Sequence, residues 1–497
     1  MMKLSRLFKD FAWTSIFVVF GAFLGYGMRI LFARNLSPSD YGLFYSVVSF
    51  FALFSLFRSL GMTESLVHFI PKYTAVKNWN KLRSLIRFVF SIQLLLSFIF
   101  SLLFFIFAKS IAVNFFHIES AASLIRLQAI TFFVIGIVEI LVSIFRGFQN
   151  PIFASLYDPI RLLVVVALSI MFLKLKIFHI DNLFLAWLLS YAVLAVLYFI
   201  QLYLKYKKVF LFSIKKEKSV VKDIISYSIP LMLGVGIQII FARIDELILL
   251  FFKGTVQVAL YEIAYPASQL MTILVSPFLF ILFPLVSKLY FEKNKEGIRN
   301  ILQMIYNAGL FFAAPLTLLL FFYPEIIIKL LFSSKYLEAS MALQVMTIGT
   351  FFSMFSNINL NVLSGIGKIA TRTKILYAIG IFNVILNLIL VPKFGYMGAV
   401  FATSSSFFLL WFSSYAAFSK EVPGFKLSKS HLLRILFCSF VFMFLVIFLK
   451  KILILNMYFE AALIMFVSFT VYFVLGIFVF KIINIKAVKE MIGEIRK

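Results

Sequence analysis

Long apolar runs follow one another along almost the whole chain, separated by short segments that carry Lys, Arg, Pro or Gly. Most runs reach the roughly 20 residues that a helix needs to cross the hydrocarbon core of a bilayer. Of the 497 residues, 63% are hydrophobic and 13% are charged, whereas soluble domains are about 45–50% apolar and about 25% charged. A soluble protein of this composition could not cover its surface with polar groups, so we expect the chain to fold in a membrane.

The runs predict an all-α, polytopic membrane protein with fourteen transmembrane helices. They lack the two-residue alternation of barrel strands and are about twice as long as such strands. The loops between the runs are short, so no separate catalytic domain is expected. The spans are placed near residues 11–32, 41–70, 85–108, 122–145, 153–173, 182–204, 226–252, 256–283, 299–323, 338–363, 374–391, 396–418, 431–449 and 458–480.

The distribution of Lys and Arg orients these helices. With the N-terminus in the cytoplasm and the spans alternating, the inside segments hold 32 of the 47 Lys and Arg, the outside loops hold 10 and the spans hold 5. Positive charge collects in the cytoplasmic loops of membrane proteins. We therefore predict a multi-pass protein of the cell (cytoplasmic or inner) membrane with both termini inside. The basic loops are expected to face anionic lipid, and no nucleic-acid partner is expected.

A weak internal repeat has a period of about 215 residues, or six helices. "SPSDYGLFYSVVSF" follows the first span and "GTVQVALYEIAYPA" follows the seventh, and Pro71 and Pro284 occupy similar positions near the ends of the next spans. Because six is even, the halves share one orientation, as in transporters that bind substrate between parallel repeats. The expected parts are an N-terminal lobe at 1–208, a cytoplasmic linker at 209–222, a C-terminal lobe at 223–420, and two further helices with a basic cytoplasmic tail at 421–497.

Ionisable side chains lie inside the first eight predicted spans, although charge is costly in hydrocarbon and usually functional there. Asp158 and Arg161, like Arg243 and Glu246, are three residues apart and can pair on one helix face. The charges are interpreted either as structural ion pairs or as the lining of a hydrated cavity that binds an anion. Charged residues are absent from the middle of the last six spans, which favours the cavity. The set comprises Arg29, Arg58, Arg126, Arg161, Arg243, Glu64, Glu139, Asp158, Asp245, Glu246 and Glu262.

Arginine suits a phosphate ligand because its planar fork donates two parallel hydrogen bonds. The arginines predicted to bind an anion are Arg58, Arg161 and Arg243, which lie deeper in their spans. Arg29 and Arg126 lie near the outer ends of their spans and are interpreted either as interfacial anchors or as part of the cavity. The carboxylates predicted to orient these arginines or to carry a coupling cation are Glu64, Asp158, Asp245 and Glu246.

Polar uncharged residues mark the second half of the chain. Asn357 and Asn361 are interpreted either as contacts for sugar hydroxyls or as interhelical hydrogen-bond formers. The sequence has no P-loop, no G-x-S-x-G and no His/Cys metal spacing, so neither an enzyme nor a bound metal or other cofactor is expected. An ion gradient of Na+ or H+ is left open as the energy source.

Four strings resemble the polysaccharide biosynthesis and export branch of the multidrug/oligosaccharidyl-lipid/polysaccharide exporter superfamily, which includes the O-antigen flippases. They are "NLSPSDYGLFYSV", "SLGMTESLVHFIPKY", "LSGIGKIATRTKI" and "FNVILNLILVPKFGYMGAVFATSSS". The resemblance implies a V-shaped, MATE-like pair of six-helix lobes with two extra helices bounding a groove for a lipid tail. It implies a flippase that moves polyprenyl-diphosphate-linked oligosaccharide, an O-antigen-type repeat unit, to the outer leaflet by alternating access. By this resemblance Arg58, Arg161 and Arg243 would bind the diphosphate, with Arg29 as a weaker candidate.

Other functions stay open at this point. One is a cation-coupled exporter of small molecules or drugs from the same superfamily. Another is a non-transporting scaffold for glycan synthesis, and a third is a membrane-embedded polymerase or ligase. The expected partners are the lipid-linked oligosaccharide, membrane lipids, and glycosyltransferases or a polymerase of the same pathway.

Overall fold

The computed structural model describes residues 4–210, 218–425, 428–453 and 457–482, and the regular elements in these ranges are all helical. The chain divides into two compact units, residues 1–259 and 260–497. Each unit is described by itself. The predicted all-α, polytopic class is thereby confirmed. The predicted boundaries of the two lobes, the linker and the C-terminal part stay a prediction.

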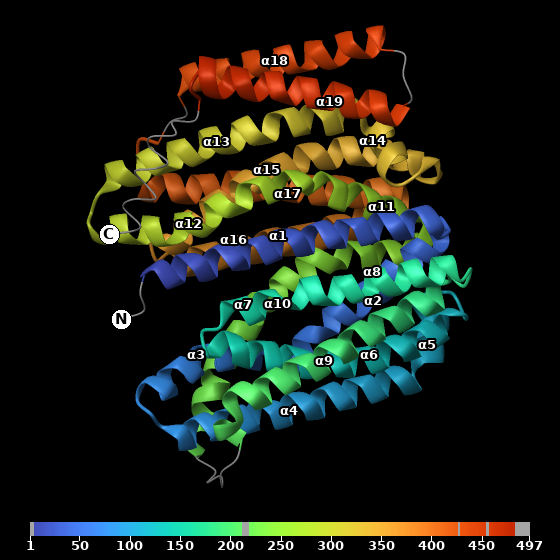
Figure 1. Cartoon of the computed structure of the whole chain (residues 1–497), viewed down its shortest axis with the longest axis vertical. Helices are drawn as coiled ribbons and strands as arrows, with labels where there is room; N and C mark the ends of the chain where they lie inside the picture. The colour runs from blue at the N-terminus through green and yellow to red at the C-terminus, as the bar shows by residue number, and fades with distance from the viewer. Residues whose placement is uncertain (1–3, 211–217, 426–427, 454–456, 483–497) are drawn as a thin grey trace. The chain divides into compact units, whose positions relative to one another are not determined.

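The first unit is a helix bundle. In its described part the helices are α1 (Leu4–Asn35), α2 (Pro38–Ser59), α3 (Met62–Ala75), α4 (Trp79–Ile106), α5 (Ala108–Asn114), α6 (Ala121–Gly147), α7 (Pro151–Ser155), α8 (Tyr157–Lys174), α9 (Ile180–Phe210), α10 (Lys218–Lys253) and the start of α11 (Thr255–Ser268). α6 packs against α3, α4 and α9, and α10 packs along α2 and α3 (Figure 1). α6 takes this central place because it is apolar around most of its circumference.

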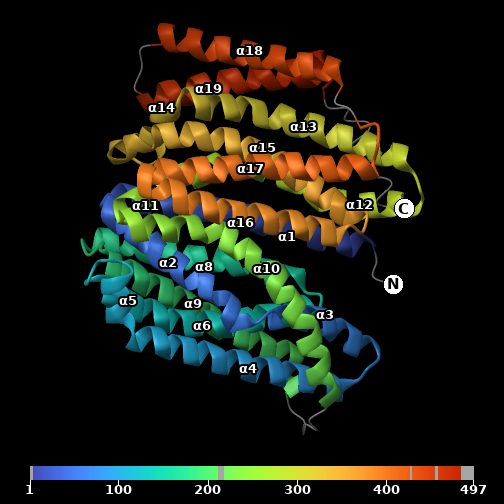
Figure 2. The same cartoon turned by 180° about the vertical axis from the view of Figure 1, so that it is seen from behind.

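The second unit is a helix bundle as well. After the end of α11 its described helices are α12 (Leu270–Phe291), α13 (Lys295–Phe322), α14 (Pro324–Leu331), a 3₁₀ turn at Ser334–Ala339, α15 (Ser340–Gly365), α16 (Ile369–Phe394), α17 (Tyr396–Glu421), α18 (Lys429–Ile452) and α19 (Met457–Val474). α15 packs against α12, α13 and α17, and α16 and α17 lie antiparallel (Figure 2). α18 contacts α13 and pairs with α19.

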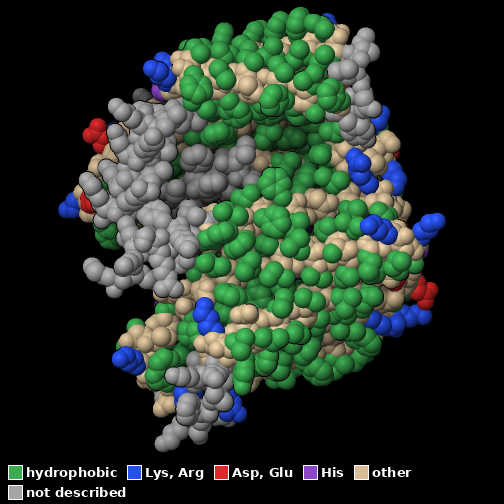
Figure 3. Space-filling view, viewed as in Figure 1, with side chains coloured by type: hydrophobic (Ala, Val, Ile, Leu, Met, Phe, Trp, Pro, Cys, Tyr) green, Lys and Arg blue, Asp and Glu red, His purple; other side chains and the backbone are tan. Residues whose placement is uncertain are grey.

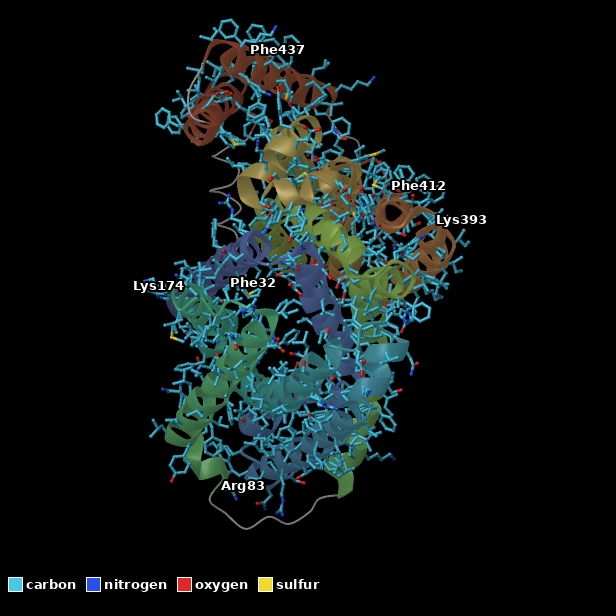
Figure 4. All side chains as sticks on the ribbon, turned by 90° about the vertical axis from the view of Figure 1, so that its right-hand side faces the viewer. Phe32, Arg83, Lys174, Lys393, Phe412 and Phe437 are labelled. Carbon is cyan, nitrogen blue, oxygen red and sulfur yellow. The ribbon has the colours of Figure 1, made fainter. Side chains whose placement is uncertain are left out.

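Thirteen helices in the described ranges are long and apolar enough to cross a membrane. Apolar side chains cover the visible helix faces, and Lys and Arg gather towards helix ends (Figure 3). Phe412 and Phe437 are 57% and 51% exposed on outer faces, whereas Phe32 is fully buried (Figure 4). This pattern identifies a multi-pass membrane protein. The eighth predicted span, 256–283, coincides with α11 and α12, which are separated at Gln269. The count of fourteen and the orientation stay predictions.

The second predicted span, 41–70, is wrong as a single helix, because the structure divides it into α2 and α3. Leu60 and Gly61 both have positive φ, 45° and 70°, and two such residues end a helix. A Cβ built on Gly61 would lie 2.6 Å from the carbonyl oxygen of Ser228 on α10. Glycine is therefore required here, and the hydropathy of the run conceals the break.

The internal repeat is visible in how equivalent helices begin. The side-chain oxygen of Asn78 accepts a hydrogen bond from the backbone N–H of Lys81 at the start of α4, across 3.1 Å. At the start of α13, Asn294 accepts one from the N–H of Gly297 across 2.7 Å. Both are N-caps, which satisfy a backbone donor that the helix leaves free. The caps are 216 positions apart, as the predicted duplication requires.

Equivalent glycines also repeat within the two units. Gly147, at the end of α6, packs on α3, and a Cβ there would lie 2.8 Å from the carbonyl oxygen of Leu66. Gly365, at the end of α15, packs on α12, and a Cβ there would lie 3.2 Å from the carbonyl oxygen of Phe283. These matched contacts confirm that the chain consists of two pseudo-symmetric halves followed by α18 and α19.

Candidate functional site

The ionisable residues predicted to bind an anion all lie in the first unit, on α1, α2, α8 and α10. The two asparagines predicted to contact sugar lie on α15 in the second unit. Each group is described within its own unit.

Arg58 lies in the last turn of α2 and is 1% exposed. Its Nη2 donates to Oε1 of Glu139 on α6 across 2.6 Å, and its Nη1 donates to the carbonyl oxygen of Phe132 across 3.0 Å. The guanidinium also lies over the Phe132 ring, 4.2 Å from its centroid. In this conformation the fork of Arg58 is occupied by Glu139 and Phe132, and its Nε makes no hydrogen bond.

Arg161 lies in α8, and its side chain is 12% exposed. Its Nη2 donates to Oδ1 of Asp158 across 3.0 Å, as the three-residue spacing predicts. The guanidinium lies 4.7 Å from the ring centroid of Trp187 and 5.6 Å from that of Tyr191, both on α9. Its Nε and Nη1 are buried and make no hydrogen bond. Arg161 is thus a positioned cation with two donors available to an acceptor.

Arg243, on α10, pairs with Glu246 of the same helix, with 3.2 Å between Nη1 and Oε1, as predicted. Ser49 of α2 donates to the other carboxylate oxygen of Glu246 and also accepts from Arg243. The side chain of Arg243 is 34% exposed, whereas that of Glu246 is 2% exposed. Glu246 and Ser49 therefore hold Arg243 from the buried side. The neighbouring Asp245 is 3% exposed.

The remaining residues of the predicted site lie in different places in the first unit. The guanidinium of Arg29, on α1, lies 4.3 Å from the ring centroid of Tyr45. Glu64 is in the first turn of α3, directly after the break, where a helix N-terminus favours negative charge. Asp158 is 58% exposed in the first turn of α8.

The predicted sugar contacts show one direct link. Asn361 donates from Nδ2 to the backbone oxygen of Asn357 across 2.8 Å, so this amide is engaged by its own helix. The side chain of Asn357 is exposed. The neighbouring Asn359 is buried and joins three helices, because it accepts from Tyr306 of α13 and donates to Ser414 of α17.

Sequence reasoning did not assign a role to Glu139 or to the aromatic residues beside Arg161. Glu139 is 81 positions from Arg58, so no helical spacing connects them. Trp187 and Tyr191 carry no signal in a chain that is 18% aromatic. Within the described ranges, no three His, Cys, Asp or Glu side chains come together as a metal-binding group.

The repeated helical halves and the arginines held inside the first bundle define a class of polytopic membrane proteins built as a duplicated helix bundle. Solved structures of this fold include "Lipid II flippase MurJ, inward closed conformation", with a TM-score of 0.74 and 18% identity over 94% of this chain and 98% of that one. Another is an inward-facing multidrug resistance MATE family transporter of the MOP superfamily, with a TM-score of 0.67 and 15% identity over 82% of this chain and 94% of that one. The predicted MATE-like fold is confirmed.

The chain belongs to the polysaccharide biosynthesis protein family, which it matches over residues 7–290. It also matches the MatE family over residues 230–392. It is 31% identical to an uncharacterized membrane protein of Methanocaldococcus jannaschii, over 98% of both chains. The resemblance inferred from the sequence is thereby confirmed.

Proposed function

We propose that this protein is a flippase that moves a polyprenyl-diphosphate-linked oligosaccharide from the cytoplasmic to the outer leaflet of the cell membrane by alternating access. Membership in the polysaccharide biosynthesis protein family supports this proposal. A fold shared with a lipid II flippase supports it as well, because that protein is named for moving a lipid-linked substrate. The pathway enzymes that supply and use the oligosaccharide are its proposed partners.

The observation that carries the proposal is the geometry of Arg161. Asp158 accepts a hydrogen bond from Nη2 of this arginine, and the rings of Trp187 and Tyr191 lie beside the guanidinium. The donors Nε and Nη1 are buried and remain without a partner. Unsatisfied buried donors are costly, and a phosphate oxygen is the acceptor that an arginine fork matches best. Arg161 is therefore proposed as the first ligand of the diphosphate.

Further roles follow from position. Arg243, partly exposed and held by Glu246 and Ser49, and Arg29 are proposed as additional diphosphate ligands. Arg58 joins them only when it leaves Glu139. Asp158 and Glu246 orient arginines, while Glu64 and Asp245 are the proposed sites for a coupling cation. The sugar is proposed to contact Asn357 and Asn361.

The lipid tail is proposed to lie along α19. A groove of about 520 Å³ on this helix and on the π-helical turn that follows it (Leu475–Val479) is lined almost entirely by apolar side chains, which match a polyprenyl chain. The residues that line it are Met465, Phe466, Phe469, Thr470, Phe473, Val474, Ile477 and Phe478.

The test compares R161A and R243A with wild-type protein in liposomes that receive a fluorescent polyprenyl-diphosphate sugar. Both variants are expected to insert and fold normally but to lose flipping, and R161K is expected to be weaker than wild type because it lacks the planar fork. R126A is the control, because Arg126 is exposed on α6. Full activity of both R161A and R243A would contradict the diphosphate role.

A second candidate is an exporter of small cationic molecules. The MatE match over residues 230–392 favours it, and so does the buried carboxylate of Asp245, which suits an organic cation. This function predicts that a cationic dye is transported and that D245N abolishes its transport, whereas R161A leaves it intact.

A further inference from the structure

We propose that Glu139 is a positioning residue that controls whether Arg58 can bind substrate, and that a proton taken up by Glu139 releases the Arg58 guanidinium towards the diphosphate. This inference rests on the proposed flippase function. It gives a role to an intramembrane carboxylate that the diphosphate site does not otherwise use.

The two partners of the ion pair are unequally exposed. Arg58 is 1% exposed, whereas the side chain of Glu139 is 34% exposed. A proton can therefore reach the carboxylate of Glu139 while Arg58 stays enclosed. Only Oε1 of Glu139 is bonded to Arg58, so Oε2 is the oxygen available for protonation.

Arg58 has few other partners in its pocket. Gly136 leaves room for the side chains of both Ser97 and Arg58, because a Cβ there would lie 3.0 Å from Cβ of Ser97 and 3.3 Å from Cδ of Arg58. Gln93 donates to the carbonyl oxygen of Gly136, and Ser97 donates to that of Gln93, so neither donor is directed at Glu139. If Glu139 is neutral, its Oε1 and the Phe132 carbonyl remain as acceptors for Arg58, but the negative charge that balances the guanidinium is gone.

The ionisable groups that interact with Glu139 are few. Arg58 of α2 forms the ion pair, and Tyr157 of α8 lies within electrostatic range. α4 adds only the uncharged Gln93 and Ser97 to this pocket. Among the described side chains of α3, α5, α7 and α9, which also pack on α6, no ionisable group bonds to Glu139. Protonation of Glu139 is therefore coupled chiefly to Arg58.

The step itself is a simple proton uptake. A proton from water bonds to Oε2, the carboxylate becomes a neutral acid, and Arg58 loses its counter-ion inside a low-dielectric bundle. A buried cation without a counter-ion is unstable, so it moves to another anion. Arg58 lies two residues before the positive-φ pair Leu60–Gly61 that ends α2, so the helix does not fix the backbone beyond it. The diphosphate is the anion that the proposed function supplies.

The first experiment does not depend on transport. Full-length protein is treated with phenylglyoxal at one mildly alkaline pH, and labelling of each arginine is measured by mass spectrometry. Arg58 is expected to be protected in wild type and in E139D, and to be labelled in E139Q to the level of the exposed Arg126. Equal labelling of Arg58 in wild type and E139Q would overturn the proposal.

The second experiment measures the rate of flipping of the fluorescent polyprenyl-diphosphate sugar against pH. Wild type is expected to flip faster as the pH falls, E139D to show a shifted profile, and E139Q to lose the pH dependence. E119Q, in an exposed loop, is the control and should keep the wild-type profile. A wild-type profile in E139D, or a Glu139-dependent response to Na+ at constant pH instead, would overturn the proton as the trigger.

The two experiments separate the two proposals. If wild type moves no lipid-linked sugar but Arg58 becomes labelled in E139Q, the flippase function fails and the control of Arg58 by Glu139 stands. If E139Q does not fold, the E139D profile and the wild-type protection of Arg58 decide the matter.

Discussion

Gly147 packs against Leu66 so closely that a Cβ on the glycine would lie 2.8 Å from the leucine carbonyl oxygen and 2.7 Å from Cδ1 of Ile70. α6 meets α3 at this point, and the same contact recurs at Gly365, where the nearest atom would be 3.0 Å away. Two separate helix crossings with glycine at equivalent positions show that the duplication preserves packing and not only helix order.

The first prediction concerns these glycines. G147A is expected to lower the apparent Tm of the purified protein more than G365A, because its Cβ would meet backbone and a branched side chain at shorter distances. Overpacking of this kind costs about 1–3 kcal/mol. G27A is the control, since a Cβ on Gly27 has no described atom within 4 Å. Equal Tm values for G147A and G27A would contradict the packing described.

The second prediction concerns the repeated N-caps. N78A and N294A should each destabilise the protein by about 1 kcal/mol, because each removes the acceptor for a backbone N–H of the first turn. N78D and N294D should keep the stability of the wild-type protein, since aspartate caps a helix as well as asparagine does. Thermal unfolding in detergent measures both pairs, and an unchanged Tm in the alanine variants would show that the caps contribute nothing.

The third prediction concerns the ion pair between Arg58 and Glu139. E139L leaves a buried guanidinium without its counter-ion and is expected to cost about 3–5 kcal/mol. R58M should cost less, because Glu139 is 34% exposed and can be hydrated. The double variant R58M/E139L should be more stable than E139L, since it removes both charges together. A double-mutant cycle of apparent Tm values tests this order, and purely additive losses would argue against the pairing.

The fourth prediction concerns orientation. Lys77 and Lys176 both lie in exposed loops with positive φ, and the basic-residue distribution places Lys77 inside and Lys176 outside. In a C438S background, a membrane-impermeant maleimide added to intact cells should label K176C and not K77C. Labelling of both after permeabilisation is the control. The opposite pattern would reverse the predicted topology.

Sequence reasoning succeeds where a physical rule acts locally. Hydropathy predicts the membrane class, and the three-residue spacing predicts the pairs Asp158–Arg161 and Arg243–Glu246, which the structure has at 3.0 and 3.2 Å. It fails at the break after α2, because Leu60 and Gly61 continue an apolar run and only the backbone angles reveal the turn.

The candidate site shows the same limit. Arg58 and Glu139 meet across two helices, and their distance along the chain gives no indication of it. The aromatic side chains that flank Arg161 come from α9, and only tertiary packing brings them to α8. The sequence therefore shows which residues are charged. The structure was needed to show which arginines are already paired and which have donors without a partner.

Movement of a lipid-linked diphosphate sugar by this protein alone can be tested directly. Liposomes that contain this protein alone would receive either a fluorescent polyprenyl-diphosphate disaccharide or a cationic dye, and transfer between leaflets or across the bilayer would be followed. We predict that the diphosphate-linked sugar is flipped, that R161A abolishes this, and that the dye is not moved. Transport of the dye without movement of the lipid-linked sugar would contradict the account.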